Sequence, residues 1–145
     1  MALVPKDNKF AEKVRESFAR QPVMAFIGAE LVKVEAGAVD IRLPSRSNLT
    51  QQNGFLHAGI TSAIVDTACG YAAFSLMPAR TDVVTSEFKI NFLSPAIGSH
   101  FLAEGRVLKA GKTLSVVRGD VFACEAAGKK LIATMLATVV CVRKT

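Results

Sequence analysis

Apolar residues recur at every fourth position near the start of the chain, a spacing that predicts a surface helix. Within residues 8–20, the apolar stripe among charged neighbours consists of Phe10, Val14 and Phe18. The Gln21-Pro22 pair should end this helix, because a proline ring blocks its continuation. We therefore expect an N-terminal helical segment over residues 1–22.

Most of the remaining chain alternates between apolar and polar residues, as strands do. Residues 29–35 and 38–43 alternate and are joined by Ala36-Gly37, which predicts a hairpin. Three later runs are separated by short turns that contain glycine. They predict a meander of strands at residues 100–109, 113–124 and 130–142.

One more strand is predicted between Pro78 and the Ser94-Pro95 pair. Strict alternation divides its side chains between two faces, with Val84, Ser86, Phe88, Ile90 and Phe92 on one and Thr85, Glu87, Lys89 and Asn91 on the other. In this register the Thr85 side chain lies out of phase with Phe88.

Residues 55–77 form a long stretch in which Asp66 is the only formally charged side chain. The stretch could cross a bilayer by its length, but a carboxylate at the bilayer centre costs about 2.5 to 3.5 kcal/mol. The amphipathic strands that follow also argue against a membrane. We expect a buried central helix over residues 55–77, wrapped by an antiparallel sheet of about six strands, in one α+β domain over residues 1–145.

The net charge of +6 and the isoelectric point near 9.5 fit a polyanionic partner. The basic residues are scattered, and the chain has one tyrosine and no tryptophan, so we do not expect a nucleic-acid surface with stacking aromatics. Three separated cysteines offer neither a metal pair nor a disulfide framework, and the charged N-terminus lacks a secretory signal pattern. We expect a cytoplasmic protein that binds a small polyanionic ligand and uses no metal and no cofactor.

A carboxylate inside an apolar helix needs a partner, a shifted pKa or a role in a pocket. Asp66 is therefore either a satisfied structural residue or a catalytic one with a raised pKa. Ala58 and Gly59 stand where the helix should start, and their free backbone N–H groups can stabilise an oxyanion. Gln51, in the polar loop upstream, can donate another N–H, whereas His57 either caps the helix or takes part in catalysis.

The spacing between the helix start and the carboxylate predicts a shared site. Ala58 and Asp66 are eight residues apart, which separates them by about 12 Å along a helix axis. One substrate carbonyl cannot easily contact both, whereas a two-fold arrangement brings the donors of one subunit to the carboxylate of the other. We therefore expect an obligate homodimer with two sites at its interface.

Other chemistries find less support in the sequence. Possible nucleophiles on the helix are Ser62, Thr67 and Cys69, but no Ser-His-Asp or Cys-His arrangement can be identified. Two histidines and separated cysteines give too few zinc ligands, and no dinucleotide- or phosphate-binding glycine motif is present. The turn between Lys109 and Lys112 is either a phosphate contact or a solvated hairpin tip.

Three segments together resemble the hot-dog-fold acyl-CoA thioesterases, in particular the phenylacetate-degradation (PaaI-type) branch. These segments are NGFLHAGITSAIVDTACG, EFKINFLSPA and KAGKTLSVV. The resemblance covers about residues 29–142 and is carried by Gln51, His57 and Asp66, while Ala58 replaces the first glycine of the family's His-Gly-Gly motif. It implies that the Ala58 N–H and the Gln51 side chain polarise the thioester carbonyl. Asp66 of the partner subunit would then act as general base or nucleophile.

The same resemblance implies further contacts and a larger assembly. Thr85 falls where family members often carry a hydroxyl that helps to hold the catalytic water. Dimers of dimers are common in the family, so we expect a homotetramer. The candidates for contact with coenzyme A and its phosphates are Asn53, Arg46, Lys89, Lys109 and Lys112.

These observations predict an enzyme that hydrolyses an aryl- or medium-chain acyl-CoA to the free acid and coenzyme A. Because one fold hosts several functions, a non-hydrolytic acyl-CoA-binding protein and an enoyl-CoA hydratase stay as alternatives. The sequence does not identify the acyl group, since Phe55, Phe88 and Phe92 could line an aryl pocket or belong to the core.

Overall fold

The structure is a computed structural model that describes residues 2–145. Its helices pack on one six-stranded sheet. In chain order its elements are α1 (Phe10–Ala19), α2 (Pro22–Ile27), β1 (Glu30–Glu35), β2 (Ala38–Pro44), the short 3-10 helix η1 (Ser47–Leu49), α3 (Ala58–Phe74), β3 (Thr81–Phe92), β4 (His100–Ala110), β5 (Leu114–Glu125) and β6 (Gly128–Arg143). The strands pair antiparallel in the order β1-β2-β4-β5-β6-β3. The edges of the sheet are therefore β1 and β3.

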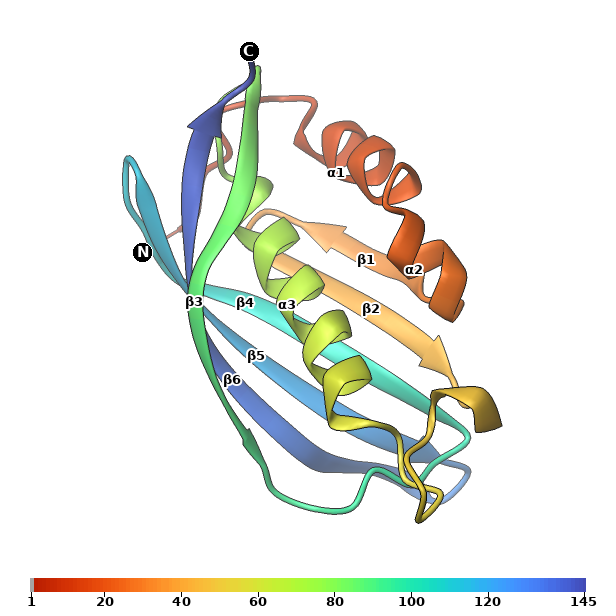
Figure 1. Ribbon diagram of the computed structural model, residues 1–145. Coiled ribbons are helices and arrows are strands. Elements are labelled where there is room, and N and C mark those ends of the chain that lie inside the picture. The colour runs from red at the N-terminus through yellow and green to blue at the C-terminus, as the bar shows by residue number, and fades with distance from the viewer. Residues whose placement is uncertain (1) are drawn as a thin grey trace.

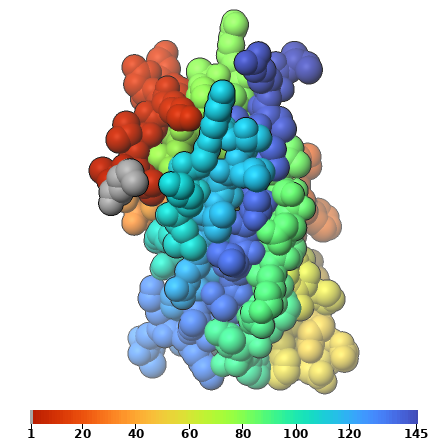
Figure 2. Space-filling model, turned by 90° about the vertical axis from the view of Figure 1, so that its left-hand side faces the viewer, coloured from red at the N-terminus to blue at the C-terminus, as the bar shows by residue number. Residues whose placement is uncertain are grey.

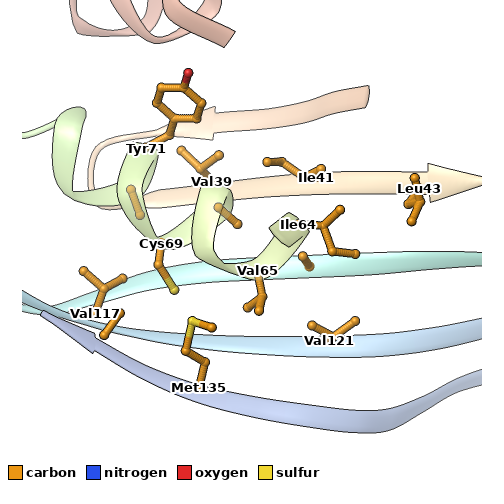
Figure 3. Close-up of a cluster of buried hydrophobic side chains, with 14 of the residues drawn as sticks. Val39, Ile41, Leu43, Ile64, Val65, Cys69, Tyr71, Val117, Val121 and Met135 are labelled. Carbon is orange, nitrogen blue, oxygen red and sulfur yellow. The ribbon is translucent and has the colours of Figure 1, made fainter. Parts of the chain in front are cut away.

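The sheet curls around α3, which lies against its concave face (Figure 1). α3 contacts β2, β3, β4, β5 and β6. Ile64, Val65 and Cys69 of the helix point towards the sheet, where they meet buried side chains that include Val39, Ile41, Val117, Val121 and Met135 (Figure 3). A single antiparallel sheet around one long apolar helix confirms the predicted α+β hot-dog fold.

The central helix is shorter than the predicted range of residues 55–77. It begins at Ala58, because Leu56 still forms an isolated bridge to Thr50 in the preceding loop. It ends at Phe74, and the Met77 N–H then donates to the Phe74 carbonyl in a turn. Within residues 2–145, no helix is both long enough and apolar enough to cross a membrane.

The N-terminal segment holds two helices where the sequence predicted one. The predicted helix is present as α1, but Pro22 does more than end it, because this residue is the first of α2. Proline is well suited to that position, since its missing N–H would have no partner inside the helix. α2 then ends at Gly28, whose φ of 80° closes the helix. Figure 1 shows α1 and α2 beside β1, on the same face of the sheet as α3.

A β-bulge in β3 overturns the predicted phase of Thr85. Thr85 pairs with Val139 and Glu87 pairs with Thr138, so Ser86 is an extra residue in this strand. The extra residue returns Thr85 to the face of Phe88, which pairs with the buried Ala137. Thr85 and Phe88 therefore share the helix-facing side of the sheet, whereas Val84 was wrongly grouped with Phe88.

Two glycines let the sheet approach α3 closely. A Cβ at Gly105 would lie within 2.8 Å of the Cys69 nitrogen and still closer to the Ala68 carbonyl, both of them helix backbone. A Cβ at Gly119 would collide with the Val65 side chain and lie 2.6 Å from the Cys69 sulfur. Because β4 and β5 carry no side chain at these two positions, α3 can pack at a short distance from the sheet.

Gly105→Ala is accordingly expected to destabilise the fold by about 1 to 3 kcal/mol, because helix backbone cannot yield as a flexible side chain does. The measurement is the midpoint of denaturant unfolding. Gly70→Ala is the matched control, since a Cβ at Gly70 meets no atom within 4 Å. Equal midpoints for the two variants would contradict this account of the helix-to-sheet distance.

Candidate active site

Asp66 lies near the middle of α3, beside the β3 edge of the sheet. Its carboxylate is partly buried, and its Oδ1 accepts a hydrogen bond of 2.7 Å from the Thr85 hydroxyl. No group in residues 2–145 bonds to Oδ2, and no fully buried side-chain polar atom in these residues lacks a partner. Oδ2 is therefore open to the cavity of about 410 Å³ that Asp66 and Thr85 both line.

The surroundings of Asp66 favour its protonated form. Burial raises the pKa of this carboxyl above its usual range, and the hydrogen bond from Thr85 partly opposes the shift. The direction confirms the raised pKa that the sequence predicts. Once ionised, a carboxylate with a raised pKa is a stronger base than an exposed aspartate.

The pH dependence of activity should report this shift. Asp66 has to be ionised to accept a proton or to attack, so kcat/KM should fall as the pH drops through its raised pKa. We expect the acid limb to be centred above about 3.9, the usual value for aspartate. Thr85→Val removes the bond that lowers this pKa, so it should move the limb to still higher pH. A limb at the usual value, or one that moves to lower pH in Thr85→Val, would contradict this reading.

The N-terminal helices supply one wall of the Asp66 cavity, which sequence reasoning missed. The Tyr71 hydroxyl accepts a bond of 3.1 Å from the Gln21 side chain and shares another of 3.1 Å with Ser17. Figure 3 shows the Tyr71 ring pointing away from the sheet, opposite to Cys69. Asp82, at the start of β3, also lines the cavity. The one signal available in the sequence was the single tyrosine, whose hydroxyl needs a partner when the ring is buried.

The start of α3 leaves one backbone donor free. The His57 Nδ1 accepts the Gly59 N–H at 2.8 Å, so His57 caps the helix and Gly59 is not a free donor. This contact corrects the prediction that both N–H groups are available. No group in residues 2–145 accepts a hydrogen bond from the Ala58 N–H. Ala58 is exposed and lines a second cavity, of about 170 Å³.

Gln51 lines the same second cavity, and its loop fixes the direction of its amide. The backbone N–H groups of Asn53 and Phe55 both donate to its Oε1. Because Oε1 is held by these two donors, Nε2 is the end of the amide that can donate to a ligand. The Asn53 side chain is exposed, and Asn53 lines neither this cavity nor that of Asp66. In this loop the backbone N–H of Asn53, rather than its side chain, therefore orients the Gln51 amide.

The predicted residues thus fall into two groups within one chain. Asp66 and Thr85 line the first cavity, whereas Gln51 and Ala58 line the second. Phe55 and Phe92 also line the second cavity. Phe88 and Phe92 are 42% and 51% exposed, so core packing does not account for them.

The four basic candidates for phosphate contacts are spread over the molecule. Lys109 and Lys112 border a cavity of about 330 Å³ near the C-terminal end of α3, away from Ala58. Arg46 donates to Asn48 and to the Phe26 carbonyl. Lys89 pairs with Leu136 on β6 and so lies on the convex face of the sheet. The structure does not gather these side chains at either candidate cavity.

The three possible nucleophiles of α3 are engaged or inert. Ser62 and Thr67 donate to the carbonyls of Ala58 and Ala63, one turn earlier. Cys69 is fully buried, and burial, together with the charges of Asp66 and Asp120, raises the pKa of its thiol to about 12. Asp66 is consequently the helix residue best placed for acid–base or nucleophilic chemistry.

The sequence matches a protein-family model and is similar to a known protein along most of its length. The family model described as "Thioesterase superfamily" matches residues 53–126. A protein of Saccharolobus solfataricus that is named for an inferred esterase activity is 37% identical over 133 residues, which cover 92% of this chain and 86% of the relative.

Solved structures extend the comparison to the fold. A thioesterase family protein from Silicibacter pomeroyi is 49% identical, with a TM-score of 0.91 over 92% of this chain and 98% of the other. The PaaI protein of the E. coli phenylacetic acid degradation operon has a TM-score of 0.85 over 97% of this chain and 98% of its own, at 18% identity. The likeness to PaaI is one of fold.

Proposed function

The chain belongs to the thioesterase superfamily, and on that premise we propose that it hydrolyses an aryl- or medium-chain acyl-CoA to the free acid and coenzyme A. Membership of this family supports thioester hydrolysis, while the substrate and the catalytic residues are our proposal. The observation that carries it is the Asp66 carboxylate, which is fixed by Thr85 at one oxygen and open to a cavity at the other. We also propose that the protein acts in the cytoplasm and that it belongs to the PaaI-type branch of the superfamily.

In the proposed mechanism, Asp66 acts on one side of the thioester and the helix start acts on the other. As general base, Oδ2 takes a proton from water while the water oxygen bonds to the carbonyl carbon. The Ala58 N–H and the Gln51 Nε2 of the partner subunit hold the resulting oxyanion. The C–S bond then breaks, and coenzyme A leaves as a thiolate that takes up a proton. No metal or redox cofactor takes part, and coenzyme A is part of the substrate.

Asp66 can instead attack the carbonyl carbon itself and form an anhydride that water hydrolyses. A single turnover in ¹⁸O-labelled water detects the anhydride route when water opens the anhydride at the Asp66 carbonyl. If water attacks the thioester, the first product carries one ¹⁸O atom. If Asp66 attacks and water opens the anhydride at the Asp66 carbonyl, the first product carries none and the label appears in Asp66.

The edge strand β3 supports the homodimer that this mechanism requires. β3 is twelve residues long, and no strand of residues 2–145 pairs with one of its sides. The exposed apolar side chains Val84, Phe88 and Phe92 lie along it. Figure 2 shows β3, in green, beside the blue strands and next to the yellow segment around residue 50. A long apolar edge strand favours pairing with another chain.

The direction of β3 suits such a pairing. Its first half borders the Asp66 cavity through Val83 and Thr85, and its last residue, Phe92, borders the cavity of Gln51. Antiparallel pairing of two β3 strands about a two-fold axis places the first half of one strand beside the second half of the other. Each Asp66 would then face the donors of the second subunit. We propose that two such dimers form a homotetramer.

The decisive test is a panel of aryl, short-chain and medium-chain acyl-CoAs, each followed by the release of free thiol. We expect turnover with kcat/KM highest for an aryl or medium-chain substrate. Hydration of an enoyl-CoA without thiol release would instead assign a hydratase. Tight binding of acyl-CoA without any product would assign a binding protein. Charge-removing variants of Arg46, Lys89, Lys109 and Lys112 should raise KM wherever the side chain contacts a phosphate.

A further inference from the structure

Gly70 lies one helical turn after Asp66, on the same side of α3, and lines the same cavity. Glycine inside a helix costs roughly 0.5–1 kcal/mol relative to alanine. Close packing does not require it here, since a Cβ at this position would meet no atom within 4 Å. Gly105 and Gly119 differ in this respect, because a Cβ at either would collide with α3. Gly70 therefore leaves open space beside the carboxylate.

The N-terminal segment encloses this space. Gln21 bonds to the Tyr71 hydroxyl through Nε2, and its Oε1 lies 3.4 Å from the Thr67 hydroxyl. Ser17 makes a second contact to the same hydroxyl. These bonds tie the junction of α1 and α2 to the turn of α3 that carries Gly70. The cavity is thus closed on one side by a fixed wall.

This wall determines which part of the substrate can enter. The coenzyme A portion is long and carries charged phosphates, so it has to extend from the thioester towards solvent. The acyl group is the end of the molecule and can stop against the wall. The reacting carbonyl carbon has to lie about 3–3.5 Å from Asp66. The space over Gly70 is about 6 Å further along the helix. Atoms beyond the second carbon of the acyl group therefore fill this space.

We propose that Gly70 is a specificity-determining position, whose missing side chain makes room for an acyl group with a ring or branch close to the thioester. This inference rests on the proposed thioesterase function and names the acyl class. A benzoyl or phenylacetyl ring reaches the space over Gly70, whereas an acetyl group ends before it. A larger side chain at position 70 should lower kcat/KM for benzoyl- or phenylacetyl-CoA and leave kcat/KM for acetyl-CoA unchanged.

The experiment compares kcat/KM for benzoyl-, phenylacetyl- and acetyl-CoA in the wild type, Gly70→Ala and Gly70→Val. One methyl group in a pocket changes discrimination by about 10- to 200-fold. We expect the aryl-to-acetyl ratio to fall by at least about tenfold in Gly70→Ala, and further in Gly70→Val. The Tm of Gly70→Ala should equal or exceed that of the wild type, because alanine favours the helix. An unchanged ratio in both variants would overturn the inference.

Binding measurements separate this inference from the proposed function. Thioether analogues of coenzyme A that carry a benzyl or an ethyl group, in place of benzoyl or acetyl, cannot be hydrolysed, and calorimetry gives their Kd. We expect Gly70→Ala to weaken only the benzyl analogue, by about tenfold. If the wild type hydrolyses none of the acyl-CoAs but this selective loss is seen, the proposed function fails while the assignment of Gly70 stands. If the wild type hydrolyses acyl-CoA but both analogues bind equally to both proteins, only the assignment of Gly70 fails.

Discussion

Replacing Asp66 by asparagine is expected to lower kcat for acyl-CoA hydrolysis by about 10² to 10⁴, the usual loss when a general base is removed. Asparagine keeps the size of the side chain and can still meet the Thr85 hydroxyl, but it can neither take a proton from water nor attack a carbonyl. The measurement is the rate of thiol release at saturating substrate. A kcat within about tenfold of the wild type would show that Asp66 is not the catalytic carboxylate.

The matched control is Asp82→Asn, which removes the other carboxylate of the same cavity. The Asp82 Oδ1 accepts the neighbouring Val83 N–H, and within residues 2–145 no hydrogen bond joins Asp82 to Thr85. We expect this variant to keep kcat within a few-fold of the wild type. A large loss here, together with a small one in Asp66→Asn, would transfer the catalytic role to Asp82.

Stability should change in the opposite direction from activity. The raised pKa of Asp66 means that its ionised form is less favourable in the folded than in the unfolded chain. This unfavourable contribution is absent below the unfolded pKa and fully present above the folded one. Asp66→Asn removes it, so the variant should be at least as stable as the wild type at neutral pH. The midpoint of denaturant unfolding checks this expectation, and an unchanged or higher midpoint would show that a loss of activity is not due to unfolding.

The fold was predictable because its signals are local. Alternation along the chain marked the strands, and one uncharged stretch marked the helix that they cover. The phase of Thr85 was not predictable in this way, since the bulge at Ser86 adds one residue to β3 without a change in composition. One extra residue exchanges the two faces of a strand. The partner of Asp66 was for this reason assigned to the wrong face.

The site was predictable only as far as it depends on a single segment. Asp66 stands out as a lone charge in α3, and its raised pKa follows from that setting. The capping bond from Gly59 to His57 needs a specific side-chain rotamer, which no spacing encodes. The wall at Tyr71 needs the docking of α1 and α2, and its partners Ser17 and Gln21 are about fifty residues away in the sequence. Such contacts follow from tertiary packing rather than from a pattern.

Mixing two inactive variants is expected to restore activity if the site is shared between subunits. Gln51→Ala removes one oxyanion donor and should lower kcat by about 10² to 10³, and Asp66→Asn removes the carboxylate. In a dimer of one chain of each kind, one site takes its wild-type Asp66 from the first chain and its wild-type Gln51 from the second. The other site carries both substitutions. Random pairing of equal amounts gives half mixed dimers, so about one quarter of the wild-type activity should return.

The two variants should be co-expressed, because pairing has to occur while the chains fold. Each variant expressed alone gives the baseline, and the double variant Gln51→Ala with Asp66→Asn, co-expressed with wild type, gives the comparison. In that comparison every mixed dimer has two sites with one defect each, so only the wild-type dimers, about one quarter of the total, stay active. A mixture of the single variants that stays at its baseline would place Asp66 and Gln51 in the same chain's site. The distance of about 12 Å along α3 argues against that outcome, because one thioester carbonyl cannot span it.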